Sequence, residues 1–248
     1  GAVAGAESND KTEIYGGSFE LMENPGVSDH CTYYVSSIYG GQFTLGNNTD
    51  SGAQVFYESE IAKGYRVSTK DGWHIVEPIT VKVSTADELV AALENNQNVI
   101  FANDIKIDPA NMSNAYGKTG INVKNGQTID GNGHTLNIKG AGGTWDSGIN
   151  TTGGRIENIT VTGSFRGIFI NHTSEHSEKV ILENVTIGGN GTVYTISCDQ
   201  GLYQGIEATN CTFNGWTSFA KTAGEAKFVN CKFGEGSGYK YCRPYSKT

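Results

Sequence analysis

The chain reads Leu182-Glu183-Asn184-Val185-Thr186-Ile187 in its second half, and this pattern decides the fold because it recurs three times. The other copies are Ile156-Glu157-Asn158-Ile159-Thr160-Val161, Ala208-Thr209-Asn210-Cys211-Thr212-Phe213 and Phe228-Val229-Asn230-Cys231-Lys232-Phe233. Their asparagines lie 26, 26 and 20 residues apart. A repeat of this size with alternating apolar residues is typical of similar coils stacked along one axis. We therefore predict a coil stack rather than a globular sandwich.

The asparagine of each copy marks a bend. The residues two before it and one after it are apolar, and they cannot share one face of a straight strand. Asn tolerates a left-handed backbone, and its amide both donates and accepts hydrogen bonds. We predict that Asn158, Asn184, Asn210 and Asn230 form a buried ladder inside the bend, bonded between coils about 4.8 Å apart. Four ordinary Asn turns are the alternative.

The composition of the chain argues against two classes of partner. The chain has 248 residues and a net charge of −8, which argues against nucleic acid as a partner because phosphate binding needs a basic face. No segment approaches the run of about 20 apolar residues that spans a membrane, so we expect no membrane insertion.

Cys211 and Cys231 share a repeat position one coil apart. We expect both to point inward as small apolar residues, with a disulfide or a metal as the alternative.

The chain divides into three parts. Residues 1–10 are small and polar and are expected to be a disordered tail. Residues 11–79 form a β-rich segment, with two Gly-Gly-x-Phe repeats (residues 14–19 and 38–43) and a hairpin over residues 64–77 around Asp71-Gly72. Residues 80–248 contain the coils. They begin with a helix near 85–95, for which Thr85 and Glu88 provide a capping box and which can cover the open apolar end of the stack.

The stretch Gln127-Thr128-Ile129-Asp130-Gly131-Asn132-Gly133-His134-Thr135-Leu136 precedes the asparagine repeats. Together with the helix and the repeats, it resembles the pectate-lyase-like superfamily over roughly residues 80–248. The resemblance implies an all-β fold, a right-handed single-stranded parallel β-helix with an N-terminal capping α-helix. Residues 60–76 and the Gly-Gly-x-Phe repeats resemble segments between β-helix repeats in large surface proteins of gut bacteria. That resemblance implies a secreted or cell-surface protein.

Enzymes of this superfamily work on the outer face of the cylinder. Lyases resemble one another in an acidic calcium site with an arginine base, and hydrolases in paired aspartates with a Gly-His-Gly segment; this chain has neither Asp-Asp nor Gly-His-Gly. Asp146, Asp199 and Glu225 could converge from loops beside an outward Arg166, but solvated loop charges are the alternative. We therefore assign no catalytic residue.

His172 and His176 lie in a polar loop with no evident third ligand, so we expect no metal and no cofactor. Aromatic residues are more suggestive because exposed rings stack on sugars or anchor a protein partner. They occur mainly in loops or at non-core repeat positions: Trp145, Tyr194, Tyr203, Trp216, Tyr239, Tyr241 and Tyr245. We predict that Trp145, Trp216, Tyr239 and Tyr241, with Arg166, contact a ligand; the alternative is that such rings close the ends of coils.

These expectations lead to one main hypothesis for the function. It is a non-enzymatic, adhesin-like module that binds a glycan or a surface protein on its outer face. A polysaccharide lyase or glycoside hydrolase, including the phage tailspike kind, is the second hypothesis. It requires two or more carboxylates that converge with Arg166 or a histidine in one outward groove. The third hypothesis is a structural fibre segment whose open ends associate end to end.

Overall fold

The computed structural model describes residues 13–20, 37–44, 58–108, 119–139, 143–172, 177–189, 191–199, 204–219 and 224–235, and the backbone of 244–246. The chain forms two compact units, residues 1–79 and 80–248, which are described separately. In the described ranges no helix has the length and apolar content that a membrane span requires.

The first unit has two small sheets, with strand orders β1-β3 and β2-β4-β6-β5. Their elements are β1 (Glu13–Ile14), β2 (Ser18–Glu20), β3 (Ser37–Ile38), β4 (Gly41–Thr44), the 3-10 helix η1 (Glu58–Glu60), β5 (Tyr65–Lys70) and β6 (Trp73–Pro78). The predicted hairpin is confirmed: β5 and β6 pair antiparallel. Asp71 and Gly72 in its turn have φ angles of 51° and 80°, the positive values that a tight hairpin turn requires.

The Gly-Gly-x-Phe repeats of this unit stack in register. Tyr15 lies on Tyr39 with ring centroids 4.8 Å apart, and Phe19 lies on Phe43 at 5.0 Å. The strands that carry them pair in parallel, β1 with β3 and β2 with β4. A further turn, which we did not predict, follows at Ile61, whose backbone bridges in parallel to the second repeat. The repeats are therefore stacked in parallel as successive coils.

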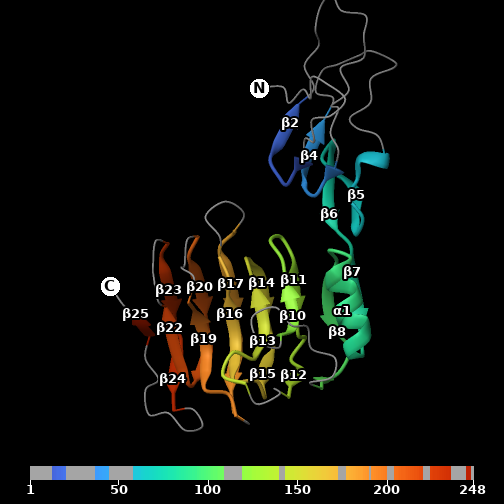
Figure 1. Cartoon of the computed structure of the whole chain (residues 1–248). Helices are drawn as coiled ribbons and strands as arrows, with labels where there is room; N and C mark the ends of the chain where they lie inside the picture. The colour runs from blue at the N-terminus through green and yellow to red at the C-terminus, as the bar shows by residue number, and fades with distance from the viewer. Residues whose placement is uncertain are drawn as a thin grey trace, which may run out of the picture. The chain divides into compact units, whose positions relative to one another are not determined.

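The second unit is a parallel β-helix of three sheets, in which strands of successive coils lie side by side (Figure 1). Sheet 1 contains β7 (Thr80–Val83), β8 (Asn98–Phe101), β11 (Thr128–Asp130), β14 (Gly154–Glu157), β17 (Val180–Glu183), β20 (Ile206–Thr209) and β23 (Ala226–Val229). Sheet 2 contains β9 (Ile105–Ile107), β12 (Thr135–Ile138), β15 (Thr160–Thr162), β18 (Thr186–Gly188), β21 (Thr212–Asn214) and β24 (Lys232–Gly234). Sheet 3 contains β10 (Thr119–Val123), β13 (Ser147–Thr151), β16 (Arg166–Ile170), β19 (Tyr194–Cys198), β22 (Trp216–Phe219) and β25 (Pro244–Ser246). This architecture confirms the predicted parallel β-helix.

Apolar side chains in register fill the interior, one column from each sheet. Sheet 1 contributes Ile129, Ile156, Leu182 and Ala208; sheet 2 contributes Leu136, Val161, Ile187 and Phe213; sheet 3 contributes Ile121, Ile149, Ile168 and Ile196. All of them belong to one buried cluster. Each coil therefore buries its apolar surface mainly against the coils before and after it, as repeat proteins do.

The predicted helix is α1 (Ala86–Glu94), and its capping box is present. Thr85 Oγ1 accepts a hydrogen bond from the Glu88 backbone N–H at 3.2 Å, and the Glu88 carboxylate accepts one from the Thr85 N–H at 3.2 Å. Leu89 and Leu93 are buried in the same cluster as the coils. Figure 1 shows α1 beside β7 and β8, where the stack begins. The helix therefore covers the apolar end of the first coils, as predicted.

Each asparagine of the repeat occupies the corner between sheets 1 and 2. Asn158, Asn184, Asn210 and Asn230 have φ angles of 51°, 54°, 56° and 53°, so the predicted left-handed bend is present at all four. Asn184 Nδ2 donates to Asn158 Oδ1 at 3.0 Å, and Asn230 Nδ2 donates to Asn210 Oδ1 at 2.6 Å. Asn158 Nδ2 donates to Asp130 Oδ1 at 3.1 Å, which extends the ladder by one coil.

The expected burial of this ladder is wrong. Asn184, Asn210 and Asn230 are exposed, and Asn158 is half-buried. The reason lies in the corner itself, because the apolar residues on both sides of each Asn turn into the core: Leu182 and Val185 are fully buried. The asparagine between them is directed outward.

Candidate binding surface

The outer face of sheet 3 brings together several of the polar and aromatic side chains that the sequence had suggested singly. Ser147, Arg166, Tyr194 and Trp216 are in register on β13, β16, β19 and β22. Each begins its strand, directly after the turn from sheet 2. The parallel pairing therefore places residues that are distant in sequence in one row along the stack.

A local break in the alternation of inward and outward residues turns this row outward. Gly167 and Ile168 follow Arg166, and both positions face the interior: Ile168 is fully buried, and a methyl group on Gly167 would collide with the side chain of Ile187. Two consecutive inward positions interrupt the alternation of a regular strand. Arg166 and Phe169 on either side then lie on the outer face, where the guanidinium lies 5.6 Å from the Phe169 ring centroid.

Arg166 is the centre of this surface. Its Nη1 forms an ion pair with Asp199 Oδ2 at 2.6 Å and a hydrogen bond with Ser197 Oγ, and its Nε donates to the Thr144 carbonyl at 3.1 Å. Only 9% of the Arg166 side chain is exposed, against 31% for Asp199. A buried guanidinium that donates to Asp199, Ser197 and the Thr144 carbonyl is fixed in position, because its donors have a rigid, planar arrangement.

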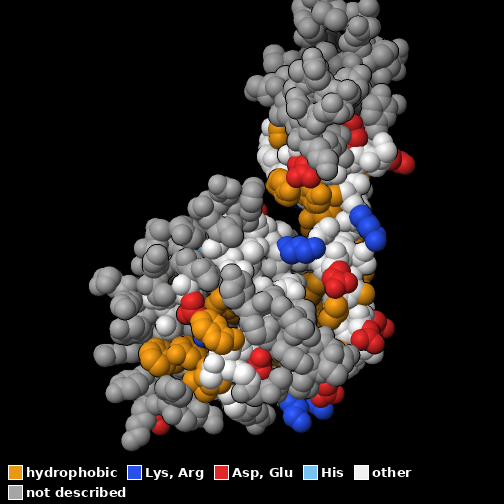
Figure 2. Space-filling view, in the orientation of Figure 1, with side chains coloured by type: hydrophobic (Ala, Val, Ile, Leu, Met, Phe, Trp, Pro, Cys, Tyr) orange, Lys and Arg blue, Asp and Glu red, His pale blue; other side chains and the backbone are white. Residues whose placement is uncertain are grey.

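Aromatic rings pack on both sides of the guanidinium. Its central carbon lies 4.5 Å from the Trp145 ring centroid and 5.1 Å from that of Tyr194. Tyr194 stacks on Trp216 with centroids 5.2 Å apart and planes within 11°. We call Trp145, Arg166, Tyr194 and Trp216 the aromatic–arginine row. Figure 2 shows hydrophobic side chains gathered over the part of the molecule where Figure 1 places β19 and β22.

The predicted ligand-binding residues differ in how much of each side chain is exposed to a ligand. Trp145 is 51% exposed, whereas Trp216 is half-buried and stacked on Tyr194. β16 and β22 flank β19 on opposite sides, so Arg166 and Trp216 cover opposite faces of the Tyr194 ring. The predicted Tyr239 and Tyr241 lie outside the described residues. Trp145 is therefore the exposed aromatic side chain of the row.

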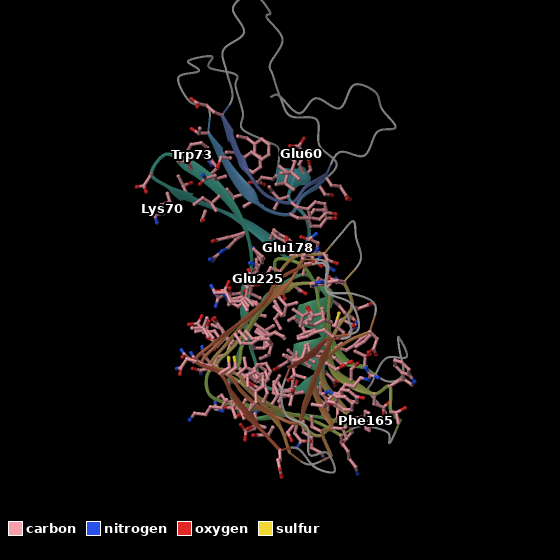
Figure 3. The ribbon with its side chains drawn as sticks, turned by 90° about the vertical axis from the view of Figure 1, so that its left-hand side faces the viewer. Glu60, Lys70, Trp73, Phe165, Glu178 and Glu225 are labelled. Atoms are coloured by element: carbon pink, nitrogen blue, oxygen red, sulfur yellow. The ribbon has the colours of Figure 1, made fainter. Side chains whose placement is uncertain are left out.

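The three loop carboxylates do not all lie beside Arg166. Asp199 pairs with its side chain. Asp146 accepts from the Arg166 backbone N–H through its carbonyl at 2.9 Å, and its buried carboxylate accepts from the Gly143 backbone N–H at 3.0 Å. Glu225 lies far from Phe165, the neighbour of Arg166 in sequence (Figure 3). Glu225 precedes β23 in sheet 1, on another side of the cylinder from sheet 3. The sequence leaves convergence open as one of two alternatives, and the structure shows instead an ion pair between Arg166 and Asp199.

A second arginine on sheet 1 does contact two carboxylates, and we did not predict it. Arg155 Nη1 lies 3.0 Å from Glu157 Oε2 and 2.6 Å from Glu183 Oε2. The hydrogen bond that Arg155 donates to the Glu183 carboxylate is the largest of several effects that raise the pKa of Arg155 above its ordinary value. The in-register pairing of β14 with β17 produces this contact, which neighbouring sequence positions alone do not indicate.

A shallow polar groove follows the asparagine corner. It is lined by Asp130, Asn132, Asn158, Thr160, Asn184 and Thr186 among others. These side chains offer amide, hydroxyl and carboxylate groups but no aromatic ring. The groove can form hydrogen bonds with a polar ligand, yet it lacks the apolar anchor that binding sites usually contain.

His172 lies in a buried position shortly after β16. This burial lowers its pKa, so the ring is neutral near pH 7. Its Nδ1 accepts from the Gln204 N–H at 3.4 Å. His176 lies outside the described residues. Within the ranges that the structure describes, no group of three or more His, Cys, Asp or Glu side chains is arranged to hold a metal ion.

The sequence did contain a signal for the aromatic–arginine row. A small residue precedes Ile in three segments: Ser147-Gly148-Ile149, Arg166-Gly167-Ile168 and Tyr194-Thr195-Ile196. The first residues of these segments are in register with one another across sheet 3. This second repeat marks the two consecutive inward positions of sheet 3. Attention to it would have aligned Arg166 with Tyr194.

Comparison with known proteins agrees with this architecture. No curated protein and no solved structure matches the chain. Residues 80–194 match a family model described as "Putative pectate lyase-like adhesive domain". The matched region begins at β7, includes α1 and ends at the first residue of β19. This match confirms, for residues 80–194, the resemblance to the pectate-lyase-like superfamily.

Proposed function

We propose that the β-helix is a non-enzymatic adhesive module, displayed outside the cell, which binds a glycan or a surface protein through Trp145 and the outer face of sheet 3. The description of the matched family as an adhesive domain supports the general class. The observation that carries the proposal is the position of Trp145, an exposed ring held on a buried guanidinium.

Trp145 has the properties of an anchor residue. Half of it is exposed, and the Arg166 guanidinium supports its ring at 4.5 Å. Asp199 and the Thr144 carbonyl hold that guanidinium in turn. An aromatic side chain fixed before binding loses little conformational entropy when a partner arrives. Trp is also the residue type that most often dominates binding energy, and its flat ring suits sugars as well as proteins.

The other rings of the row do not offer a partner the open face that Trp145 offers. Tyr194 is covered on both faces by Arg166 and Trp216, so a ligand meets its edge and not its face. Among the described residues, the row is therefore a ridge whose exposed ring is that of Trp145. Such a ridge favours a partner that lies along the stack rather than a small molecule enclosed in a pocket.

A binding screen tests the proposal. Residues 1–248 and the Trp145→Ala variant are applied to a glycan array and to a panel of extracellular matrix and bacterial surface proteins. We expect the unchanged protein to bind at least one class and the variant to lose at least tenfold in affinity, a loss typical of an anchor residue. Thr186→Ala, in the polar groove, is the matched control and should bind normally. Equal binding by Trp145→Ala at an unchanged melting temperature would refute the assignment of the site, and no binding to any probe would count against the adhesive function.

Catalysis on polysaccharide is the second candidate, and the contact of Arg155 with Glu157 and Glu183 is the observation that favours it. A lyase would need a neutral arginine as base, but the pKa of Arg155 is raised by Glu183 and the guanidinium keeps its proton. The arrangement thus serves better as an ion-pair network on the sheet surface. Incubation with acidic and neutral polysaccharides, followed by assays for unsaturated products and new reducing ends, separates the two functions. Product formation that Glu183→Gln abolishes would replace the adhesive proposal.

A further inference from the structure

Cys211 and Cys231 occupy equivalent positions in the last two coils. The pairs Thr209–Val229 and Thr212–Lys232 are in register on either side of them. The backbone N–H of Lys232 also donates to the Cys211 carbonyl at 2.8 Å, so the two coils remain in contact at the cysteines themselves.

The two thiols approach the same stretch of backbone. Cys211 Sγ donates to the Thr209 carbonyl at 3.2 Å, and Cys231 Sγ donates to the neighbouring Ala208 carbonyl at 3.4 Å. The Cys231 side chain therefore reaches across to the strand that precedes Cys211. Residues in register on adjacent strands are about 4.8 Å apart, within the Cα separation of about 4.4–6.8 Å that a disulfide spans.

We propose that Cys211 and Cys231 form a disulfide that fastens the last coil to the coil before it when the protein meets a thiol oxidant. Both cysteines are free thiols in the structure. Their place beside each other in the stack, rather than chance proximity of loops, carries the inference. The extracellular display proposed above would supply oxidising surroundings, but the geometry of the pair does not depend on it.

The half-buried and the buried thiol would react in order. Cys231 is the more accessible of the two, and its thiolate attacks a low-molecular-weight disulfide, forming a mixed disulfide and releasing one thiolate. Cys211 then loses its proton to solvent, attacks the Cys231 sulfur and releases the second thiolate. Two cysteines are oxidised and one external disulfide is reduced to two thiols. Burial raises the pKa of Cys211 to about 11, so the second step is slow near pH 7 and accelerates as the pH rises.

The cross-link would act where the stack needs it. In the part of the chain that the structure describes, β23, β24 and β25 pair with a neighbouring strand on one side. Terminal coils of a solenoid open before internal ones because they have one interface instead of two. A bond between Cys211 and Cys231 joins the final coil covalently to the preceding coil, and so opposes this opening.

The test uses the full chain with Cys31 and Cys242 replaced by Ser, which leaves Cys198, Cys211 and Cys231. The protein is incubated with oxidised glutathione at pH 8.5, free thiols are alkylated, and the chain is digested with trypsin and a protease that cuts before Asp199. We expect a peptide containing Cys211 joined to the peptide containing Cys231, and its loss after reduction. Oxidation should also raise the melting temperature by about 5–10 °C.

Three results would overturn the proposal. In the first, Cys211 and Cys231 are both alkylated after oxidation. In the second, Cys231 is recovered only as a mixed disulfide with glutathione. In the third, the mapped disulfide joins Cys231 to Cys198. Cys231→Ser is the control for stability and should show no rise in melting temperature on oxidation. A cross-link that forms without raising the melting temperature would contradict the fastening of the last coil. None of these outcomes depends on ligand binding, so a failed adhesive function is recognised separately.

Discussion

Replacement of Arg166 by Met should destabilise the β-helix far more than the same change at Arg155. Both arginines lie on outer faces and pair with carboxylates, but the Arg166 side chain is 9% exposed and that of Arg155 is 37% exposed. Arg166→Met removes guanidinium contacts with three rings and leaves Asp199 without its cation.

The magnitude follows from burial. Desolvated cation–π contacts contribute up to about 2 kcal/mol, and removal of one partner of a buried ion pair costs about 3–5 kcal/mol. Because Asp199 is partly exposed and water can solvate it, we expect a total near 3 kcal/mol for Arg166→Met. That loss corresponds to a fall of about 6–12 °C in melting temperature for a chain of this size. Arg155→Met should cost about 0–1 kcal/mol, as exposed ion pairs do.

Thermal unfolding followed by circular dichroism measures both variants. Arg166→Lys is an informative third variant because it keeps the charge but loses the planar fork, and it should fall between the wild type and Arg166→Met. Equal melting temperatures for Arg166→Met and Arg155→Met would show that the aromatic–arginine row does not stabilise the stack. The binding argument for Trp145 would then lose its support as well, since it depends on the fixed guanidinium.

Three further predictions concern the coils. Gly167→Ala should lower the free energy of unfolding by about 1–3 kcal/mol through overpacking, because its methyl group would collide with Ile187; an unchanged melting temperature would show that position 167 does not face the interior. Asn184→Leu should cost about 1–2 kcal/mol because a φ of 54° is unfavourable for Leu, whereas Asn184→Gly should cost less, and the reverse order in urea unfolding would contradict the left-handed corner. Burial raises the pKa of Cys211 from 9.0 to about 11, so its protonated thiol stabilises the reduced fold below pH 9 and this stabilisation is lost as the pH rises toward 11; Cys211→Ala should show a smaller loss between pH 8 and 10.5, and an equal loss would exclude this thiol as the cause.

The fold was predictable because its signal is local and repeated. Each copy of the asparagine pattern sets one corner, and the apolar residues beside it identify the interior, so Leu182 and Val185 were placed correctly from the sequence. The direction of the asparagine side chain was not placed correctly. Two apolar neighbours that turn inward at a corner force the residue between them outward, and a count of alternating positions along straight strands does not contain this geometry.

Only individual members of the candidate binding surface were predicted from the sequence. Trp145, Trp216 and Arg166 were identified as single residues, but their assembly depends on which strands are adjacent and on a bulge that shifts the register between Tyr194 and Ile196. Neither feature follows from residue type. The sequence also does not show which loop carboxylate pairs with Arg166: Asp199 and Glu225 both lie in connections from sheet 3 to sheet 1, and Asp199 forms the ion pair.

The corners of the coil also differ in how freely they accept a change of length. From sheet 1 to sheet 2, the four repeats turn with one asparagine and one apolar residue, from Asn158-Ile159 to Asn230-Cys231. From sheet 2 to sheet 3, the connection spans residues 163–165 in one coil and is the single residue Gly215 in another. Insertions should therefore be tolerated beside sheet 3 and rejected at the asparagines. This asymmetry recommends the turns next to the aromatic–arginine row for grafting foreign loops, because new sequence there would be displayed without disturbing the pitch of the cylinder.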